Sequence, residues 1–340
     1  MTQSVPVIDL APSFALGAKE RQQVAEQIRI ACEGIGFFEI VGHNVPDATI
    51  EAVVTKAKEF FALPHEEKLK TPQSLERSRG YRLVGSSGLA YSLGRETPPD
   101  LQESFGVGPI YPAPPQMSDT DAELYFGSNT WPARPAGFSE AFERYYREME
   151  PLSLHLLRLF AHALDLDDYY FDDKVDHHTS TMRAIHYPPQ EEMPEPGQLR
   201  GGEHTDYGIL TILKGEDVPG GLQVKTRGGD WIDVHPRPDA FVCNIGDLMM
   251  RWTNDKWVSN LHRVVNPPPE DMRTGRLSIP FFYKPNADAE IRCIRAFYGK
   301  DEAEKYPPVK AGEFFLSKHL KAQHMTTDLR SPPDAVAGHE

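Results

Sequence analysis

Two metal-capable side chains stand just before a short apolar run in the stretch His204-Thr205-Asp206-Tyr207-Gly208-Ile209-Leu210-Thr211-Ile212-Leu213-Lys214. Similar runs recur from about Asp176 onward, separated by Gly and Pro, at 181–187, 207–214, 222–226, 231–235, 240–245 and 277–283. Short strands at this spacing are typical of an antiparallel sandwich or barrel. The clearest predicted hairpin joins 222–226 to 231–235 across Arg227, Gly228, Gly229 and Asp230.

Composition limits the class of protein. The 340 residues suffice for one large domain with additions or for two modules that share a core. A net charge of −14, without any basic run, argues against a nucleic acid or an anionic membrane as partner. No stretch approaches the ~18 apolar residues of a membrane-spanning helix, and no basic-then-apolar leader opens the chain. Cys32, Cys243 and Cys293 are far apart and odd in number, which disfavours a disulfide framework, so we expect a cytoplasmic protein.

The first part of the chain predicts an αβ module. Strand-like runs at 5–10 and 37–41 flank a helix expected over 19–33, and a second helix starts after Asp47 as N-cap and ends before Pro64. From 74 to about 130 the chain is rich in Gly, Pro, Ser and Tyr without a sustained period, which predicts irregular loops over a binding face.

Helices are expected again after residue 126. Ser139 is a candidate cap for a helical region that Pro151 should kink or split. We therefore divide the chain into an N-terminal αβ module with substrate-side loops (1–125), supporting helices (126–177), a β core (178–325) and a tail expected to be disordered (326–340).

His204 and Asp206 stand at positions i and i+2, so in an extended segment both side chains project from the same side. By itself such a pair is more often a surface turn than a metal site, and a third ligand is needed. His262 is a candidate, although alone it would be a structural histidine. Two imidazoles and one carboxylate fill one face of an octahedral ion and leave the other positions to substrate and water, an arrangement associated with non-haem Fe(II) oxygenases. The ligand types favour iron over zinc without excluding zinc.

Arg276 and Ser278 form a second i, i+2 pair, at the head of an apolar strand. Taken alone such a pair is more often a solvated strand edge, but this one follows His262 by 14 residues in the same β region. A guanidinium forks onto a carboxylate through two hydrogen bonds and Ser adds a third donor, so the pair is suited to binding an acid. Tyr187, which precedes Pro188 and Pro189, either adds a phenolic donor or packs at the start of the turn.

Together these residues resemble the Fe(II)- and 2-oxoglutarate-dependent dioxygenases, the family that includes isopenicillin N synthase and the plant flavonoid and gibberellin oxygenases. The resemblance spans nearly the whole chain. In the catalytic half it is carried by His204-Thr205-Asp206-Tyr207-Gly208, Asn244-Ile245-Gly246-Asp247 with Thr253-Asn254, Ser259-Asn260-Leu261-His262-Arg263-Val264, and Arg276-Leu277-Ser278. In the opening half it is carried by Val5-Pro6-Val7-Ile8-Asp9-Leu10, Gly36-Phe37-Phe38 and Gly42-His43-Asn44-Val45-Pro46.

The resemblance implies a mainly β protein with flanking helices, in which 178–325 forms a double-stranded β-helix, or jelly roll. It implies Fe(II) on His204, Asp206 and His262, with Arg276 and Ser278 on the distal carboxylate of the cosubstrate 2-oxoglutarate. Tyr187 matches the tyrosine that precedes proline in the family, whereas Ile185 stands where plant members often carry Asn. The implied reaction uses O2 to oxidise an unactivated C–H bond of a small molecule by hydroxylation, desaturation or ring closure, with succinate and CO2 as co-products.

Several assignments stay open at the level of sequence. Substrate contacts are expected from Tyr81, Arg82 and Phe105, with Leu83, Tyr91 and Glu103 nearby, and from Phe281 opposite. Asn244, Asp247 and Asn254 either orient ligands or hold turns, and the turn is preferred for Asp247. Two other functions remain: a 2-oxoglutarate-independent oxidase like isopenicillin N synthase, and a metal-stabilised jelly-roll sensor without turnover. The sequence indicates no oligomeric state.

Overall fold

The structure is a computed structural model, and it describes residues 4–15, 17–73, 78–86, 88–298 and 303–318. The strands are β1 Val7–Asp9, β2 Phe37–Val41, β3 Gly80–Arg82, β4 Glu103–Val107, β5 Thr181–Tyr187, β6 Gly201–His204, β7 Leu210–Gly215, β8 Leu222–Lys225, β9 Trp231–Asp233, β10 Phe241–Ile245, β11 His262–Val264, β12 Arg276–Tyr283, β13 Glu290–Ile291 and β14 Val309–Lys310. The α-helices are α1 Ala18–Gly34, α2 Asp47–Phe61, α3 His65–Lys68, α4 Asp119–Phe126, α5 Phe138–Ala163 and α6 Asp247–Trp252. Short 3-10 helices are η1 Ala11–Phe14, η2 Leu89–Leu93, η3 Asp172–Lys174, η4 Pro269–Asp271 and η5 Arg295–Phe297.

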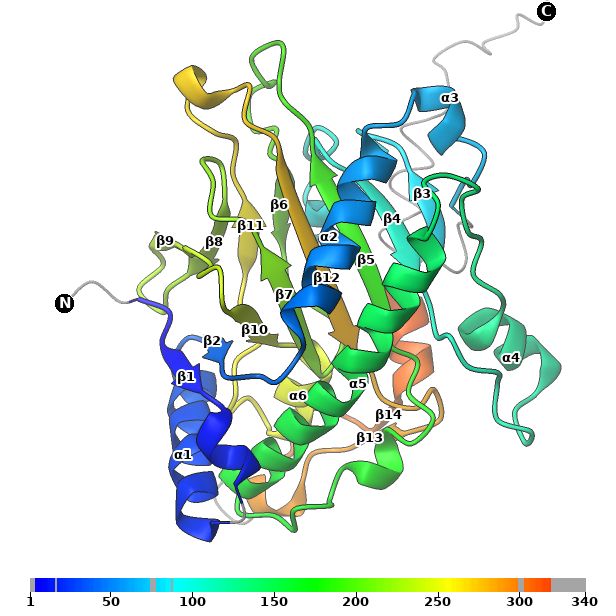
Figure 1. Ribbon diagram of the computed structural model, residues 1–340. Helices are drawn as coiled ribbons and strands as arrows, with labels where there is room; N and C mark the ends of the chain where they lie inside the picture. Colours follow the sequence, from blue (N-terminus) through cyan, green and yellow to red (C-terminus); the bar gives the residue numbers. More distant parts are fainter. Residues whose placement is uncertain (1–3, 16, 74–77, 87, 299–302, 319–340) are drawn as a thin grey trace, which may run out of the picture.

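Two β-sheets form the centre of the molecule (Figure 1). The larger has eight strands in the order β1-β2-β10-β7-β12-β5-β4-β3, and the smaller has four in the order β6-β11-β8-β9. One buried apolar cluster draws side chains from both sheets, among them Phe37, Val242, Leu222, Val224 and Val264, so the sheets pack face to face. This sandwich confirms the predicted jelly-roll core. The predicted hairpin is also present, as β8 and β9 with Lys225 opposite Trp231.

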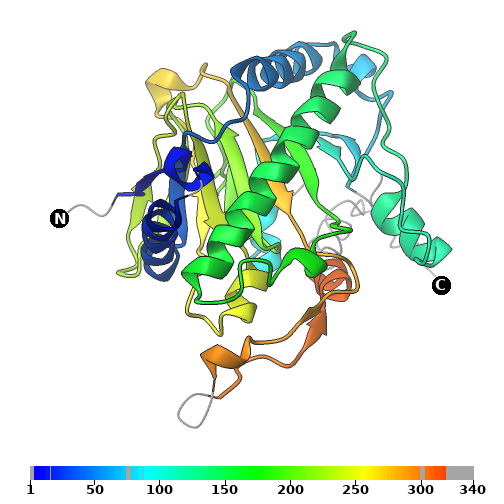
Figure 2. The ribbon, with the colours of Figure 1, turned by 60° about the horizontal axis from the view of Figure 1, so that its bottom comes forward.

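The other face of the large sheet is covered by α1, α2 and α5 (Figure 2). Helix α5 has apolar side chains at helical spacing, and its buried positions include Phe142, Met149 and Leu156. They pack on buried residues of β5, β7 and β12 in the main hydrophobic core. The helices therefore support the sheet from outside and leave the space between the sheets for the site.

Three local expectations were wrong. Residues 74–130 are not only loops, because β3 and β4 lie there and β4 pairs with β5 inside the large sheet. The strand was missed because its polar residue Glu103 is buried, where Lys68 and Tyr81 donate hydrogen bonds to its carboxylate. The helix N-caps also differ from the predicted Asp47 and Ser139. Helix α2 begins at Asp47 itself, and α5 begins after Gly137, whose φ is 77°. Pro151 lies inside α5 and does not split it, because the helix continues past this residue as one element.

The N-terminal part is not separate from the β core. Strand β2 pairs with β10 at one side of the large sheet and β4 pairs with β5 at the other, so residues of the opening half extend both edges. The predicted tail, 326–340, lies outside the described residues. Among the helices of the described part, none is long and apolar enough to cross a membrane.

Candidate active site

Pairing of two strands brings the predicted metal ligands together. His204 ends β6 and His262 begins β11, and the antiparallel register places these two residues opposite each other. Their ring centroids lie 4.2 Å apart. Asp206 follows β6 directly, and one ligand atom from each of His204, Asp206 and His262 lies within 4.8 Å of the others.

The hydrogen bonds of the two imidazoles fix which nitrogen faces the cluster. His204 Nδ1 is 2.8 Å from the carbonyl oxygen of Gly202, and His262 Nδ1 is 3.1 Å from that of Asn260. Because a carbonyl oxygen only accepts, each Nδ1 carries the hydrogen and each Nε2 keeps a free lone pair. Both Nε2 atoms are therefore available as metal ligands.

The carboxylate of Asp206 is held from one side. Its Oδ2 accepts hydrogen bonds from Thr211 Oγ1 at 2.6 Å and from Asn244 Nδ2 at 2.7 Å, while Oδ1 lies 3.9 Å from His262 Nε2. Asn244 and Thr211 stand opposite each other on β10 and β7. Asn244 thus orients a candidate ligand, one of its two expected roles. Thr211 was missed, because only the strand pairing shows that it shares this position.

The charge states suit a divalent cation. Burial, with the charge of His262, lowers the pKa of His204 to about 4, so this imidazole is neutral at pH 7. Burial tends to raise the pKa of Asp206, but His262, His204 and the two hydrogen bonds outweigh it and bring the pKa below its usual value. Neutral imidazole and ionised carboxylate are the forms that bind metal. Two nitrogens and one oxygen without thiolate fit iron at a site with open positions.

Arg276 and Ser278 lie on β12 next to β5, with Arg276 opposite Tyr187 and Ser278 opposite Ile185. The Arg276 guanidinium carbon is 5.2 Å from the centre of the Tyr187 ring. Arg276 is buried, yet none of its three guanidinium nitrogens has a hydrogen-bond partner. A buried cation without partners is costly, so this position fits an anionic cosubstrate such as 2-oxoglutarate.

Arg200 is a second buried cation on this side, and no sequence motif marked it. Its guanidinium donates to the carbonyl oxygens of Pro219, Gly220 and Thr274. Burial and the charge of Arg276 lower the pKa of Arg200 to about 10. Its position beside Arg276 depends on tertiary packing alone.

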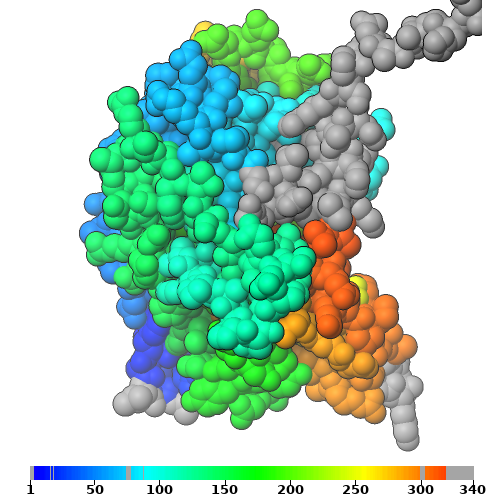
Figure 3. Space-filling view, turned by 90° about the vertical axis from the view of Figure 1, so that its right-hand side faces the viewer, coloured from blue at the N-terminus to red at the C-terminus, as the bar shows by residue number. Residues whose placement is uncertain are grey.

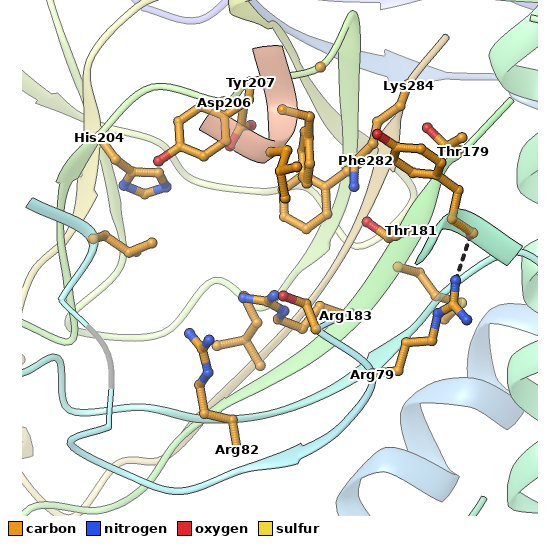
Figure 4. Close-up of a pocket in the computed structure, with 18 of the residues that line it drawn as sticks. Arg79, Arg82, Thr179, Thr181, Arg183, His204, Asp206, Tyr207, Phe282 and Lys284 are labelled. Carbon is orange, nitrogen blue, oxygen red and sulfur yellow. Dashed lines mark hydrogen bonds between the residues drawn. The ribbon is translucent and has the colours of Figure 1, made fainter. Parts of the chain in front are cut away.

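A cavity of about 210 Å³ adjoins the cluster and is lined by His204, Asp206 and Tyr207 at one end (Figure 4). Its rim includes α4 residues Leu124 and Tyr125 and the C-terminal residues Gly312 and Leu316. Figure 3 shows these two segments, α4 and residues 311–318, side by side on one face of the molecule. His204 and Asp206 therefore border a cavity and are not enclosed in packed protein.

Of the four predicted substrate contacts, the structure places only Arg82 on this cavity. Tyr81 and Phe105 are buried in the main core, where the Phe105 ring is 4.9 Å from that of Phe138. Phe281 is also in the core, 5.1 Å from the ring of Tyr146 under α5. The physical reason is strand alternation: neighbouring Phe282 points to the cavity, so Phe281 points to the helices. Of the nearby residues, Tyr91 and Glu103 are buried and are not part of the lining, and Leu83 is exposed outside it.

Comparison with known proteins identifies the family. Residues 5–134 match the N-terminal model of the non-haem dioxygenases in morphine synthesis, and residues 178–285 match the 2OG-Fe(II) oxygenase superfamily. The 2-oxoglutarate-Fe(II) type oxidoreductase hxnY of Emericella nidulans is 35% identical over 309 residues, which cover 89% of this chain and 86% of that protein. The chain belongs to the 2OG-Fe(II) oxygenase superfamily.

Two further relatives support this identification. Homoarginine-6-hydroxylase 2-ODD-233 of Oryza sativa subsp. japonica is 33% identical to the oxygenase over 332 residues, 94% of this chain and 97% of that protein. The solved structure of a full-length Neurospora crassa protein in complex with alpha-KG and thymine superposes with a TM-score of 0.81 at 30% identity, covering 93% of this chain and 96% of that one. The oxygenase is an enzyme that depends on Fe(II), 2-oxoglutarate and O2.

Proposed function

We propose that the oxygenase binds Fe(II) through His204, Asp206 and His262 and 2-oxoglutarate through Arg276 and Ser278, with Tyr187 beside them. The observation that carries this assignment is the buried guanidinium of Arg276, whose three nitrogens have no partner. It lies in the same β-sandwich as a cluster of two imidazoles and a carboxylate, in which His204 pairs across the small sheet with His262.

When bound, Fe(II) and 2-oxoglutarate would supply the oxidising chemistry, in which O2 and 2-oxoglutarate give succinate and CO2 while a substrate C–H bond is oxidised. The protein supplies position and charge. Hydrogen bonds from the imidazoles to Gly202 and Asn260 direct Nε2 of each ring inward, and Thr211 and Asn244 hold Asp206. The fork of Arg276 fits a carboxylate through parallel hydrogen bonds.

We further propose a small-molecule substrate and a cytoplasmic location. A cavity of about 210 Å³ suits a small molecule, and the net charge of −14 disfavours a nucleic acid or an anionic membrane as partner. Cys32, Cys243 and Cys293 are buried and form no disulfide in the described part of the chain, as is usual in a reducing compartment.

Anaerobic reconstitution with Fe(II) tests this function. Addition of 2-oxoglutarate should perturb the visible spectrum of the iron-loaded protein, and Arg276→Met should abolish the change. Arg273→Met is the matched control, because the side chain of Arg273 is 72% exposed. If 2-oxoglutarate neither perturbs the spectrum nor yields succinate, the proposal fails. Oxygen consumption that does not depend on 2-oxoglutarate would indicate an oxidase instead.

A further inference from the structure

The cavity beside the metal-capable cluster is lined by four basic side chains. Arg79, Arg82, Arg183 and Lys284 all contribute to its wall (Figure 4). Among the described lining residues the only carboxylate is that of Asp206. Basic side chains thus gather at one cavity, although the whole chain carries a net charge of −14.

Asp206 does not neutralise these groups. Its carboxylate accepts hydrogen bonds from Thr211 and Asn244 and faces His262, and no ion pair with a basic side chain of the cavity is present in the described part. The carboxylate of Asp206 is therefore occupied by other groups.

Arg183 is the central basic residue of this wall. It lies on β5 between Thr181 and Ile185, and strand alternation turns all three side chains to the cavity. No hydrogen bond or ion pair joins the Arg183 guanidinium to another side chain of the described residues. Burial lowers the pKa of Arg183, with no carboxylate among the causes, but an arginine stays protonated in proteins. Arg183 therefore presents an uncompensated charge.

Lys284 lies just beyond the end of β12 and is buried. Its Nζ is 3.6 Å from the centre of the Phe315 ring. Burial and the charges of Arg183 and Arg79 bring the pKa of Lys284 well below its usual value. An anionic group in the cavity would reverse this effect by favouring the protonated amine.

These basic residues are distinct from the proposed 2-oxoglutarate clamp. Arg183 precedes Tyr187 by four residues, or about 13 Å along β5, and Lys284 follows Arg276 by eight residues, or about 27 Å along β12. One carboxylate cannot reach both ends. The cavity lining also includes the apolar side chains of Leu89, Met182, Ile185 and Phe282.

We propose that the cavity binds a small organic anion, whose carboxylate or phosphate lies against Arg183 and Lys284 while its apolar body reaches toward His204 and Asp206. This assignment rests on the proposed function and names its substrate class. Guanidinium and ammonium groups in a low-dielectric cavity bind an anion through charge-assisted hydrogen bonds. An apolar molecule or a cation would leave the charge of Arg183 uncompensated.

The test uses the full chain loaded with Co(II) and 2-oxoglutarate under anaerobic conditions. Benzoate, phenylacetate and hexanoate are titrated beside benzamide, phenylacetamide and hexanamide, with phenyl phosphate as a third arm, and binding is followed by ligand-observed NMR. We expect at least one anion to bind roughly tenfold or more tightly than its neutral counterpart. In Arg183→Met and Lys284→Met this preference should shrink by a similar factor, with 2-oxoglutarate affinity unchanged.

Arg273→Gln removes one positive charge at an exposed position and should keep the preference. Tighter binding of phenyl phosphate than of the carboxylates would support the proposal and identify phosphate as the group. Two results would overturn the proposal of an anion site in a protein that still binds 2-oxoglutarate. One is equal affinity for the acids and their amides, and the other is an unchanged preference for the acids in both Met variants. Loss of 2-oxoglutarate binding in the unmodified protein would instead contradict the proposed function. Thermal unfolding of each variant shows whether it has folded.

Discussion

At the scale of the residue, the carboxylate of Asp206 shows how position is set by hydrogen bonds. Thr211 and Asn244 both donate to Oδ2, which leaves Oδ1 on the side of His262. A carboxylate held in this way cannot rotate freely, so its free oxygen stays directed at the imidazoles. Outer hydrogen bonds of this kind strengthen metal binding because they orient the ligand before the metal arrives.

Removal of either donor should weaken metal binding without loss of the fold. For Thr211→Val and Asn244→Leu we expect metal affinity to fall by about tenfold or more. The measurement is a titration of the metal-free protein with Co(II), followed by absorbance. Thr226→Val, in the β8–β9 turn, is the control and should keep the original affinity. Unchanged affinity in both site variants would show that the hydrogen bonds do not orient the ligand.

The shape of the guanidinium should matter at Arg276 as well as its charge. Lysine keeps the charge but loses the fork, so Arg276→Lys should bind 2-oxoglutarate about tenfold or more weakly. Calorimetry on the Co(II)-loaded protein measures this affinity, and Arg273→Lys should behave like the unchanged protein. Co(II) affinity should stay constant in both variants. If Arg276→Lys binds 2-oxoglutarate as tightly as the unchanged protein, the forked shape of the guanidinium does not contribute to binding.

At the scale of the element, the start of α6 fixes the segment that carries Asp206. Gly246 N donates to the carbonyl oxygen of Ile209, Asp247 N to that of Asp206 and Leu248 N to that of Gly208. The two backbones approach closely because Gly246 has no side chain: a Cβ there would lie 2.3 Å from the carbonyl oxygen of Gly208. The helix start and the metal-site loop therefore act as one unit.

Gly246→Ala should disturb this unit. Because the clashing atom belongs to the backbone, the loop must move, and both thermal stability and Co(II) affinity should fall. Gly34→Ala is a matched control, since nothing lies within 4 Å of a Cβ at that helical position. A Gly246→Ala protein with unchanged melting temperature and metal affinity would contradict the close approach.

The contact of η1 with α5 predicts a dependence of stability on pH. His155 on α5 stacks on Phe14 at 4.1 Å and lies 2.7 Å from Ser13 Oγ. Burial, with the charges of Arg21 and Arg158, lowers the pKa of His155 from 6.5 to about 4. Below pH 6.5 His155 therefore binds a proton in the unfolded chain, whereas in the folded chain it stays neutral down to about pH 4. Acidification between these two pH values therefore favours unfolding.

Melting temperatures at pH 7.5 and pH ~4.5 check this expectation. The unchanged protein should lose more stability on acidification than His155→Gln, whose side chain does not titrate. His235→Gln replaces an exposed histidine and should keep the original pH dependence. Identical pH profiles for the unchanged protein and His155→Gln would contradict the shift.

At the scale of the whole molecule, an acidic chain gathers basic side chains at one cavity. Arg183 and Lys284 are brought together by the fold without a carboxylate from the described lining residues other than Asp206. Such an arrangement costs folding free energy and is retained where binding requires it.

This cost in folding free energy should be measurable in the protein without a bound ligand. In the metal-free protein, Arg183→Met removes a buried charge and its repulsion with Lys284, so we expect the melting temperature to rise by about 2 °C. Differential scanning calorimetry measures the change, with Arg273→Met as the exposed control. A fall in the melting temperature of Arg183→Met by a similar amount would mean that the folded protein already compensates the charge of Arg183.

The local sequence pattern was sufficient to predict much of the fold and of the candidate site. Apolar runs between Gly and Pro predicted the β-sandwich, and the i, i+2 spacing of His204 and Asp206 and of Arg276 and Ser278 predicted side chains on one face, because a strand has a period of two. These inferences need only neighbouring residues. The hidden strand β4 escaped them because its buried polar side chains are stabilised by partners far away in the chain.

The sequence alone determined the candidate ligands, the candidate acid-binding pair and the family that they resemble, since these follow from side-chain chemistry, the i, i+2 spacing of two pairs and the motifs around them. Only the tertiary structure decided that Thr211 and Asn244 hold Asp206, that Phe282 and not Phe281 faces the cavity, and that Arg183 and Lys284 share its wall. The reason is physical: strand register and sheet packing set which distant residues meet, and no local period encodes that choice.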